Sequence, residues 1–340
     1  MISTLSGALG LSTTDVSFWL PLVLFALLIL VVFASVLLDG FDIGVGLLLG
    51  FASDGSRDTM MSHLSPWRDA NEMWLLLGLG LFLAAFPHAW TPIMKNLFLP
   101  LALLGAGTLL RSGAFELSMR SPFAWRGRWA MVFSAGAWCT AIAHGLALSR
   151  ILTAYITGTE YYILSSMFVV FAIATYILLG ATWLLMRATG DIRVSSALWA
   201  RQSVRWCAAG VVSVAVVLAS GNQGVLIKWV DNTSWELILI LWATLITSFI
   251  FTEISLNSIL RFGSHRTTIP YVLVILIIFL LISSVVYSFF PYFILDNITI
   301  WDAAASTLSL QFVIAIAVVI VPLAIVFNIW VYRGVLFPSK

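Results

Sequence analysis

Residues 17–50 read SFWLPLVLFALLILVVFASVLLDGFDIGVGLLLG, and this stretch decides what kind of protein the chain is. A helix needs about 20 mostly apolar residues to cross the hydrocarbon core of a bilayer. The 23 uncharged residues between Asp15 and Asp39 meet that requirement. The stretch therefore predicts a first transmembrane helix that carries Asp39 and Asp42 toward its C-terminal end.

Similar apolar stretches follow along the whole chain. Its residues are 61% hydrophobic and 9% charged, whereas soluble globular domains are roughly 25% charged. The sequence therefore predicts an all-α integral membrane protein, a single polytopic domain over residues 1–340. Nine spans are expected, near residues 17–50, 73–91, 96–110, 129–150, 161–186, 206–224, 236–260, 270–292 and 306–331. The segment Arg187–Arg205 divides a first helix group, residues 1–186, from a second, residues 206–340.

The count of nine rests on the second and third spans. Pro87, Pro92 and Pro100 interrupt the apolar region that holds them, so this region could also form one broken helix. With nine spans and an external N-terminus, 14 of the 17 basic residues, Arg111 among them, lie in cytoplasmic segments, as the positive-inside rule requires. We therefore expect nine helices and a cytoplasmic C-terminus. The basic residues are topological markers spread over several loops, so no nucleic-acid partner is expected.

The leading candidate site is the acidic pair of the first helix. Asp39 and Asp42 are three residues apart and share one helix face. Gly40, Gly44, Gly46 and Gly50 have the spacing of small residues that lets a second helix come close. Ionisable groups inside spans are costly and are functional candidates by default, so the pair could carry protons. The sequence alone equally allows a helix that ends near Gly40 and leaves the two acids as solvated caps.

A second candidate site is residues 66–74, PWRDANEMW, at the expected inner end of the second span. Asp69 followed by Glu72 has the pattern of a capping box, which needs no catalytic role. The same acids stand beside tryptophans at the membrane edge, where they could take up protons. Both interpretations stay open from the residues alone.

Other residues give weaker signals. Glu253 has Asn257 one turn away and could be a buried acid or an interfacial residue, and Asp302 is expected to cap the last helix. His144 is the one histidine well inside an expected span, and a hydrogen-bonded core role is favoured over haem ligation. Cys139 and Cys207 are expected to be buried thiols. No zinc motif, P-loop or dinucleotide fingerprint occurs, so no metal site is predicted.

The chain resembles subunit II of the cytochrome bd ubiquinol oxidases. The resemblance rests on DGFDIGVG at residues 39–46, WRDANEMW at 67–74 and FLAAFP at 82–87. It continues through Phe115–Glu116, Gly180–Thr182 with Met186–Arg187, and Trp301–Ala303, so it covers nearly the whole chain. The short loops and the length resemble most the cyanide-insensitive branch.

This resemblance implies two four-helix bundles plus a peripheral helix, in the bacterial inner membrane. It implies a heterodimer with a subunit I that carries haem b, haem d and the quinol site, and it leaves this chain without haem and without a catalytic residue of its own. Asp39 and Asp69 would belong to a proton path from the cytoplasm, followed by Asp42 and Glu72, and Trp74 would lie by a route for oxygen. A bound ubiquinone and a small single-helix third subunit occur in some such complexes.

One departure from the family pattern affects the second site. The family usually reads Trp-Asp-Gly-Asn, whereas here Arg68 precedes Asp69 and Ala70 replaces the glycine. An arginine that pairs with the carboxylate would favour its charged form, which weakens the case for Asp69 as a relay. The sequence thus predicts a proton-conducting oxidase subunit that helps reduce oxygen to water. Its alternatives are a proton-coupled secondary transporter and a membrane cytochrome that holds haem at His144.

Overall fold

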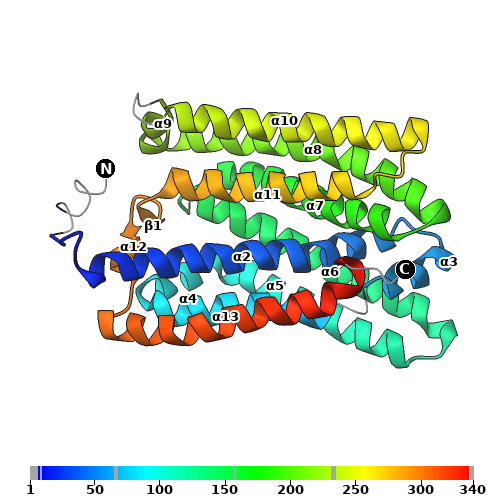
Figure 1. Cartoon of the computed structure of the whole chain (residues 1–340), viewed down its shortest axis with the longest axis horizontal. Helices are drawn as coiled ribbons and strands as arrows, with labels where there is room; N and C mark the ends of the chain where they lie inside the picture. The colour runs from blue at the N-terminus through cyan, green and yellow to red at the C-terminus, as the bar shows by residue number, and fades with distance from the viewer. Residues whose placement is uncertain (1–6, 8–9, 65–67, 156–157, 231–234, 337–340) are drawn as a thin grey trace. The chain divides into compact units, whose positions relative to one another are not determined.

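A computed structural model of the chain describes residue 7 and residues 10–64, 68–155, 158–230 and 235–336. Helices make up nearly all of this part (Figure 1). The elements are α2 (Val16–Leu49), α3 (Asp54–Ser62), α4 (Arg68–Ala85), the short 3-10 helix η1 (Pro87–Ala89), α5 (Trp90–Arg120), α6 (Phe123–Leu152), α7 (Thr159–Arg187), α8 (Gly190–Gly221), α9 (Gln223–Val230), α10 (Trp235–Phe262), α11 (Thr268–Phe289), β1 (Tyr292–Ile294), β2 (Ile298–Thr299), α12 (Ile300–Ala303) and α13 (Thr307–Leu336).

Eight helices of the described residues are long and apolar enough to cross a membrane: α2, α5 together with η1, α6, α7, α8, α10, α11 and α13. The expected second span corresponds to α4. This helix has 18 residues, and Arg68, Asp69 and Glu72 make its first two turns too polar for the same criterion. The chain is thus a multi-pass membrane protein, and the ninth span remains a prediction.

The region of the three prolines forms two helices rather than one. Helix α4 ends at Ala85 and a 3-10 turn begins at Pro87, because proline offers no N–H to continue a helix. Pro100, by contrast, lies inside α5 without ending it. The expected third span, residues 96–110, was too short: α5 runs from Trp90 to Arg120 and takes in Arg111, which the sequence had assigned to a cytoplasmic loop.

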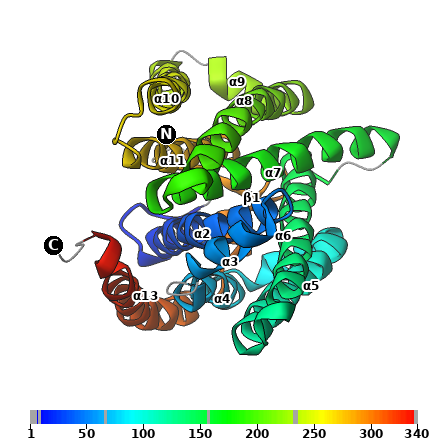
Figure 2. The same cartoon turned by 90° about the vertical axis from the view of Figure 1, so that its right-hand side faces the viewer.

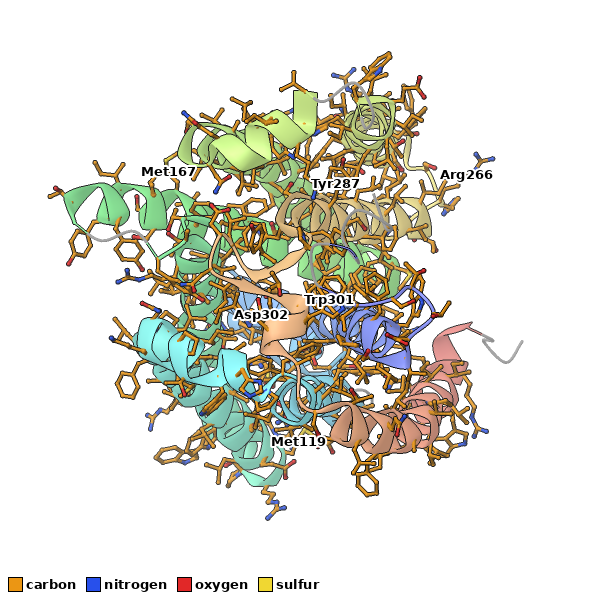
Figure 3. All side chains as sticks on the ribbon, turned by 90° about the vertical axis from the view of Figure 1, so that its left-hand side faces the viewer. Met119, Met167, Arg266, Tyr287, Trp301 and Asp302 are labelled. Carbon is orange, nitrogen blue, oxygen red and sulfur yellow. The ribbon has the colours of Figure 1, made fainter. Side chains whose placement is uncertain are left out.

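The contacts group the described residues into two compact units, and both draw on distant parts of the chain. Unit 1 takes residues up to 38 together with 66–95 and 289–340. It holds the first part of α2, α4, the antiparallel β1–β2 pair, α12 and α13. Its apolar core includes Leu24, Trp74, Phe86 and Ile300. The short helix α12 is visible in Figure 3, where Trp301 and Asp302 are labelled.

Unit 2 takes residues 39–65 and 96–288. Helix α7 packs against both α6 and α8, and α10 lies along α8 (Figures 1 and 2). A small core of Ile43, Leu47, Ala137, Ala141 and Tyr176 joins the end of α2 to α6 and α7. The grouping of the sequence into residues 1–186 and 206–340 stays a prediction.

Candidate functional site: a buried carboxylate–guanidinium pair

The two acids of α2 lie inside a continuous helix. The helix runs on to Leu49, well past Gly40, and both Asp39 and Asp42 are buried. This excludes the interpretation in which they are solvated cap residues. Both carboxylates therefore lie in the interior of unit 2, in a helix apolar enough to span the membrane.

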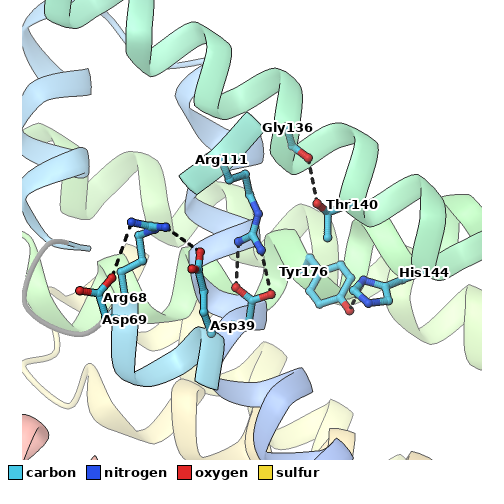
Figure 4. A network of polar contacts seen from close by, with 9 residues as sticks. Asp39, Arg68, Asp69, Arg111, Gly136, Thr140, His144 and Tyr176 are labelled. Atoms are coloured by element: carbon cyan, nitrogen blue, oxygen red, sulfur yellow. Dashed lines mark hydrogen bonds and ion pairs between the residues drawn. The ribbon is translucent and has the colours of Figure 1, made fainter. Parts of the chain in front are cut away.

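Asp39 forms a two-pronged ion pair with Arg111 of α5. The guanidinium Nη1 donates to Oδ1 at 2.8 Å and Nη2 to Oδ2 at 2.9 Å (Figure 4). Both residues are almost inaccessible, with 4% of Asp39 and 1% of Arg111 exposed. Parallel N–H···O bonds of this kind are among the strongest in proteins, and they fix the carboxylate in one orientation.

Sequence reasoning did not identify Arg111 as part of this site. It treated the residue as one more cytoplasmic basic group at the end of a short span. The available signal was its isolation: between Lys95 and Glu116 it is the single charged residue of an otherwise apolar and small-residue run. A lone arginine inside a long span requires a partner, and the acids of α2 were the available candidates.

Glycines let the helices around this pair approach closely. A Cβ atom at Gly44 would lie 2.7 Å from the backbone nitrogen of Gly180, so α2 and α7 touch backbone to backbone. A Cβ atom at Gly107 would lie 2.9 Å from the carbonyl oxygen of Gly136, which brings α5 equally close to α6. The close helix contact predicted from the glycine spacing is thus confirmed for α2.

A second polar pair lies near the ion pair. The hydroxyl of Tyr176 on α7 and Nδ1 of His144 on α6 are 3.0 Å apart (Figure 4). Both side chains interact electrostatically with Asp39 and Arg111. His144 is therefore a hydrogen-bonded core residue, as the sequence favoured. Among the described residues no group of three or more His, Cys, Asp or Glu side chains could hold a metal ion.

Asp42 lies one turn further along α2 and has different neighbours. Phe41 stacks on Trp183 of α7 at a centroid distance of 4.2 Å, and Trp183 contacts Tyr271 of α11 at 5.5 Å. Tyr271 interacts electrostatically with Asp42. Asp42 thus interacts with a tyrosine of α11 and Asp39 with an arginine of α5, although the two acids share a helix face.

The second candidate site lies in unit 1, at the start of α4. Arg68 donates from Nη2 to Oε1 of Glu72 at 2.8 Å, and its Nη1 is 3.8 Å from Oδ1 of Asp69 (Figure 4). The Asp69 side chain is 92% exposed, against 24% for Glu72. The expected capping box is wrong, because Asp69 lies within the first helical turn instead of at the cap position. Trp67 lies outside the described residues.

Asp302 and Glu253 each hold neighbouring segments of the fold together. Asp302 does not cap the last helix: it is the N3 residue of the capping box that begins α12, whose N-cap is Thr299. Glu253 pairs across helices with Arg201 and Arg205 of α8 and accepts a bond from Asn257. Glu253 thus links α10 to α8 through ion pairs. Cys139 and Cys207 are free thiols.

Outside the spanning helices, burial shifts the pKa of three groups. It lowers the pKa of His63, which follows α3, and the nearby positive charge of Arg187 lowers it further. Burial also lowers the pKa of Lys228 on α9 and raises the pKa of Tyr155. Arg266, by contrast, extends from the chain and is exposed (Figure 3).

Comparison with known proteins assigns the chain to a family. The family model of cytochrome bd terminal oxidase subunit II matches residues 20–335. The chain belongs to this family. It is therefore a subunit of a respiratory terminal oxidase, an oxidoreductase, and a multi-pass protein of the inner membrane.

Individual relatives agree with this assignment. Subunit 2 of cytochrome bd-I ubiquinol oxidase from Escherichia coli strain K12 is 23% identical over 339 residues, covering 86% of this chain and 88% of the relative. A probable cytochrome oxidase subunit 2 from Haemophilus influenzae is 22% identical with the same coverage. Subunit 2 of cytochrome bd ubiquinol oxidase from Bacillus subtilis is 35% identical over 81 residues, 23% of this chain and 24% of the relative.

A solved structure shows the same fold. The bd oxidase from Geobacillus thermodenitrificans contains a chain that superposes with a TM-score of 0.76 at 14% identity. The match covers 94% of this chain and 99% of that chain. The helical arrangement is thus preserved where most residues differ.

Proposed function

We propose that this chain is the haem-free subunit II of a bd-type quinol:oxygen oxidoreductase and conducts protons from the cytoplasm for the reduction of oxygen to water. Haem b, haem d and the quinol site belong to the partner, subunit I, in a heterodimer. The observation that supports proton conduction best is the buried Asp39–Arg111 pair inside the membrane helices. Ionisable residues are costly there and are kept for ion pathways or for tight pairing.

The pair suits a gated relay. Arg111 keeps its proton, so Asp39 is the member that can take up and release one. To accept a proton, the carboxylate must loosen its two bonds to the guanidinium. Asp39 would therefore be protonated only transiently, when charge arrives in the partner subunit, and would pass the proton on as the ion pair re-forms.

The remaining site residues have supporting roles in this proposal. The exposed carboxylate of Asp69 collects protons at the cytoplasmic mouth of α4 and Glu72 receives them there. Asp42 continues the path one turn beyond Asp39. Trp74, buried in the core of unit 1, lines a route for oxygen. These assignments follow the family resemblance, and the exposure and pairing of each acid are compatible with them.

The same proposal covers the membrane arrangement and the bound groups. Helix α4 also crosses the membrane and brings the number of spans to nine. The N-terminus is outside, and the helices form two four-helix bundles with one peripheral helix. No haem is ligated by this chain, and the contact of His144 Nδ1 with the Tyr176 hydroxyl gives this histidine a structural role. A bound ubiquinone and a small single-helix third subunit complete the complex where they occur. The family assignment gives the transporter alternative no support.

Purification from the native host tests the subunit role. A tagged chain in mild detergent should co-purify with a larger haem protein, show haem b and haem d in a reduced-minus-oxidised spectrum, and oxidise quinol. A folded, colourless chain that purifies alone would contradict the proposal.

A control variant decides whether haem resides in this chain. His144→Gln should leave the haem spectrum of the complex unchanged. Loss of a haem band in this variant, with the complex still assembled, would show that the chain does bind haem.

A further inference from the structure

The interface between α4 and α13 in unit 1 contains a strip of polar side chains. The hydroxyl of Tyr332 on α13 donates to Oδ1 of Asn71 on α4 at 2.7 Å. Asn71 is fully buried, and Asn328 lies one turn from Tyr332 on the same helix. Amide and hydroxyl groups at a helix interface in a membrane are costly unless each finds a partner.

The two helices run antiparallel. At one end the backbone nitrogen of Ala305, just before α13, donates to the carbonyl oxygen of Ala85 at 2.9 Å. At the other end lies the bond between Tyr332 and Asn71. One turn from this bond toward the Ala85 end, α4 presents Trp74 and α13 presents Asn328. Both residues thus lie about one turn from the Asn71–Tyr332 bond, on the same side of it.

Both Trp74 and Asn328 have one polar side-chain atom that is buried and unsatisfied by the part of the chain that the structure describes. Within the described residues, the indole nitrogen of Trp74 and the amide oxygen of Asn328 make no hydrogen bond, although the amide nitrogen of Asn328 donates to the carbonyl oxygen of Ala324. The residues are 3% and 8% exposed. An indole nitrogen can only donate and an amide oxygen can only accept. The two requirements are complementary, and one small molecule that accepts from the first and donates to the second satisfies both.

We propose that the α4–α13 interface binds water between Trp74 and Asn328. Together with the Asn71–Tyr332 bond, this water continues a polar path that starts at Arg68 and Glu72. The inference rests on the proposed proton conduction and extends it to two residues of the last helix. Protons move along the bound water, while Asn71, Trp74, Asn328 and Tyr332 hold the water in place and release no proton of their own. They are positioning residues.

An experimental map of the purified complex tests the water site directly. At a resolution that shows ordered water, density should lie within hydrogen-bonding distance of both Trp74 Nε1 and Asn328 Oδ1. A direct bond between the two side chains, or no density where equally buried waters are visible elsewhere, would overturn the proposal.

Asn328→Leu tests the role of the water. The variant removes the acceptor and keeps the side-chain volume similar. Gln311→Leu is the matched control, because it removes an exposed amide from the same helix. Proton uptake during a single turnover of the reduced complex, followed with a pH indicator dye, should slow several-fold in Asn328→Leu. The control should be unchanged, and the haem spectrum and the melting temperature should be the same in both.

Two further variants keep this test decisive. Asn328→Ser keeps a hydrogen-bonding oxygen and should restore part of the rate, which a purely structural role would not predict. If Asn328→Leu does not assemble, Trp74→Phe removes the indole N–H and keeps an aromatic ring. If the rate of proton uptake in the assembled variant, Asn328→Leu or Trp74→Phe, equals that of Gln311→Leu, the inference is overturned. If Asp39→Asn slows uptake and these variants do not, the inference alone fails; if none does, proton conduction by this subunit fails as well.

Discussion

The two units each contain an arginine–carboxylate pair, and the pairs differ in what surrounds them. Arg111 and Asp39 come from helices 72 residues apart in the sequence and are buried together. Arg68 and Glu72 are one turn apart on a single helix; the arginine is buried too, but its acid is partly exposed. The charges are the same, but removing the arginine leaves a carboxylate in a dry interior in the first case and carboxylates that solvent reaches in the second. The comparison teaches that burial, more than residue type, decides which pair the fold depends on.

Arg111→Gln should have the largest effect of the variants that follow. It leaves the Asp39 carboxylate buried without its cation, which costs about 3–5 kcal/mol in comparable buried pairs. The yield of assembled complex and its melting temperature should fall sharply. Asp39→Asn combined with Arg111→Gln should recover much of this stability, because no buried charge remains. A double variant as unstable as Arg111→Gln would show that the pair is not the cause.

Gly44→Ala should come next in size. The added methyl group would meet the backbone of α7 at Tyr176 and Gly180, and overpacking of this kind costs about 1–3 kcal/mol. Gly113→Ala is the control, because nothing lies within 4 Å of a Cβ atom there. Thermal melting of the purified complex should separate the two. Equal melting temperatures would contradict the close contact of α2 with α7.

Arg68→Gln should have a smaller effect than Arg111→Gln, because the carboxylates that it leaves, those of Glu72 and Asp69, both reach solvent. Its effect should also decrease at high salt, since salt screens the solvent-accessible carboxylates of Asp69 and Glu72. Measured beside Arg111→Gln in the same melting assay, it sharpens the comparison between the two units. A loss as large as that of Arg111→Gln would remove the distinction between them.

His63→Gln should have the smallest effect, visible only in the pH dependence. Because the pKa of His63 is lowered in the folded protein, the unfolded chain binds the proton first as the pH falls below about 6.5. The free energy of unfolding therefore decreases as the pH falls from about 6.5 to the lower pKa of the folded state. Above about pH 6.5 this contribution to stability is present in full. The melting temperature of the wild type should decline more than that of His63→Gln from pH 7 to pH 5. Parallel declines would exclude His63 as a contributor.

Much of the fold followed from the sequence. The apolar stretches predicted the spanning helices, and the glycine spacing predicted the close approach to α2, because both depend on local pattern. The length of α5 was missed, since charge was taken as the end of a span and Arg111 instead finds its partner inside the protein. The partners of Asp39, and the Tyr176–His144 and Tyr332–Asn71 bonds, could not be predicted, because they join residues that only the tertiary fold brings together.

Proton uptake in Asp39→Asn is the most direct test of the central claim, that this subunit conducts protons through Asp39. Asparagine keeps the shape of the side chain and removes its titratable oxygen. In the assembled complex with an unchanged haem spectrum, we expect turnover with quinol and single-turnover proton uptake to slow by an order of magnitude or more. A tenfold decrease in rate corresponds to an activation free energy that is higher by about 1.4 kcal/mol. Asp54→Asn, a change at an exposed acid of α3, should leave both unchanged. Proton uptake at the wild-type rate in Asp39→Asn would contradict the account.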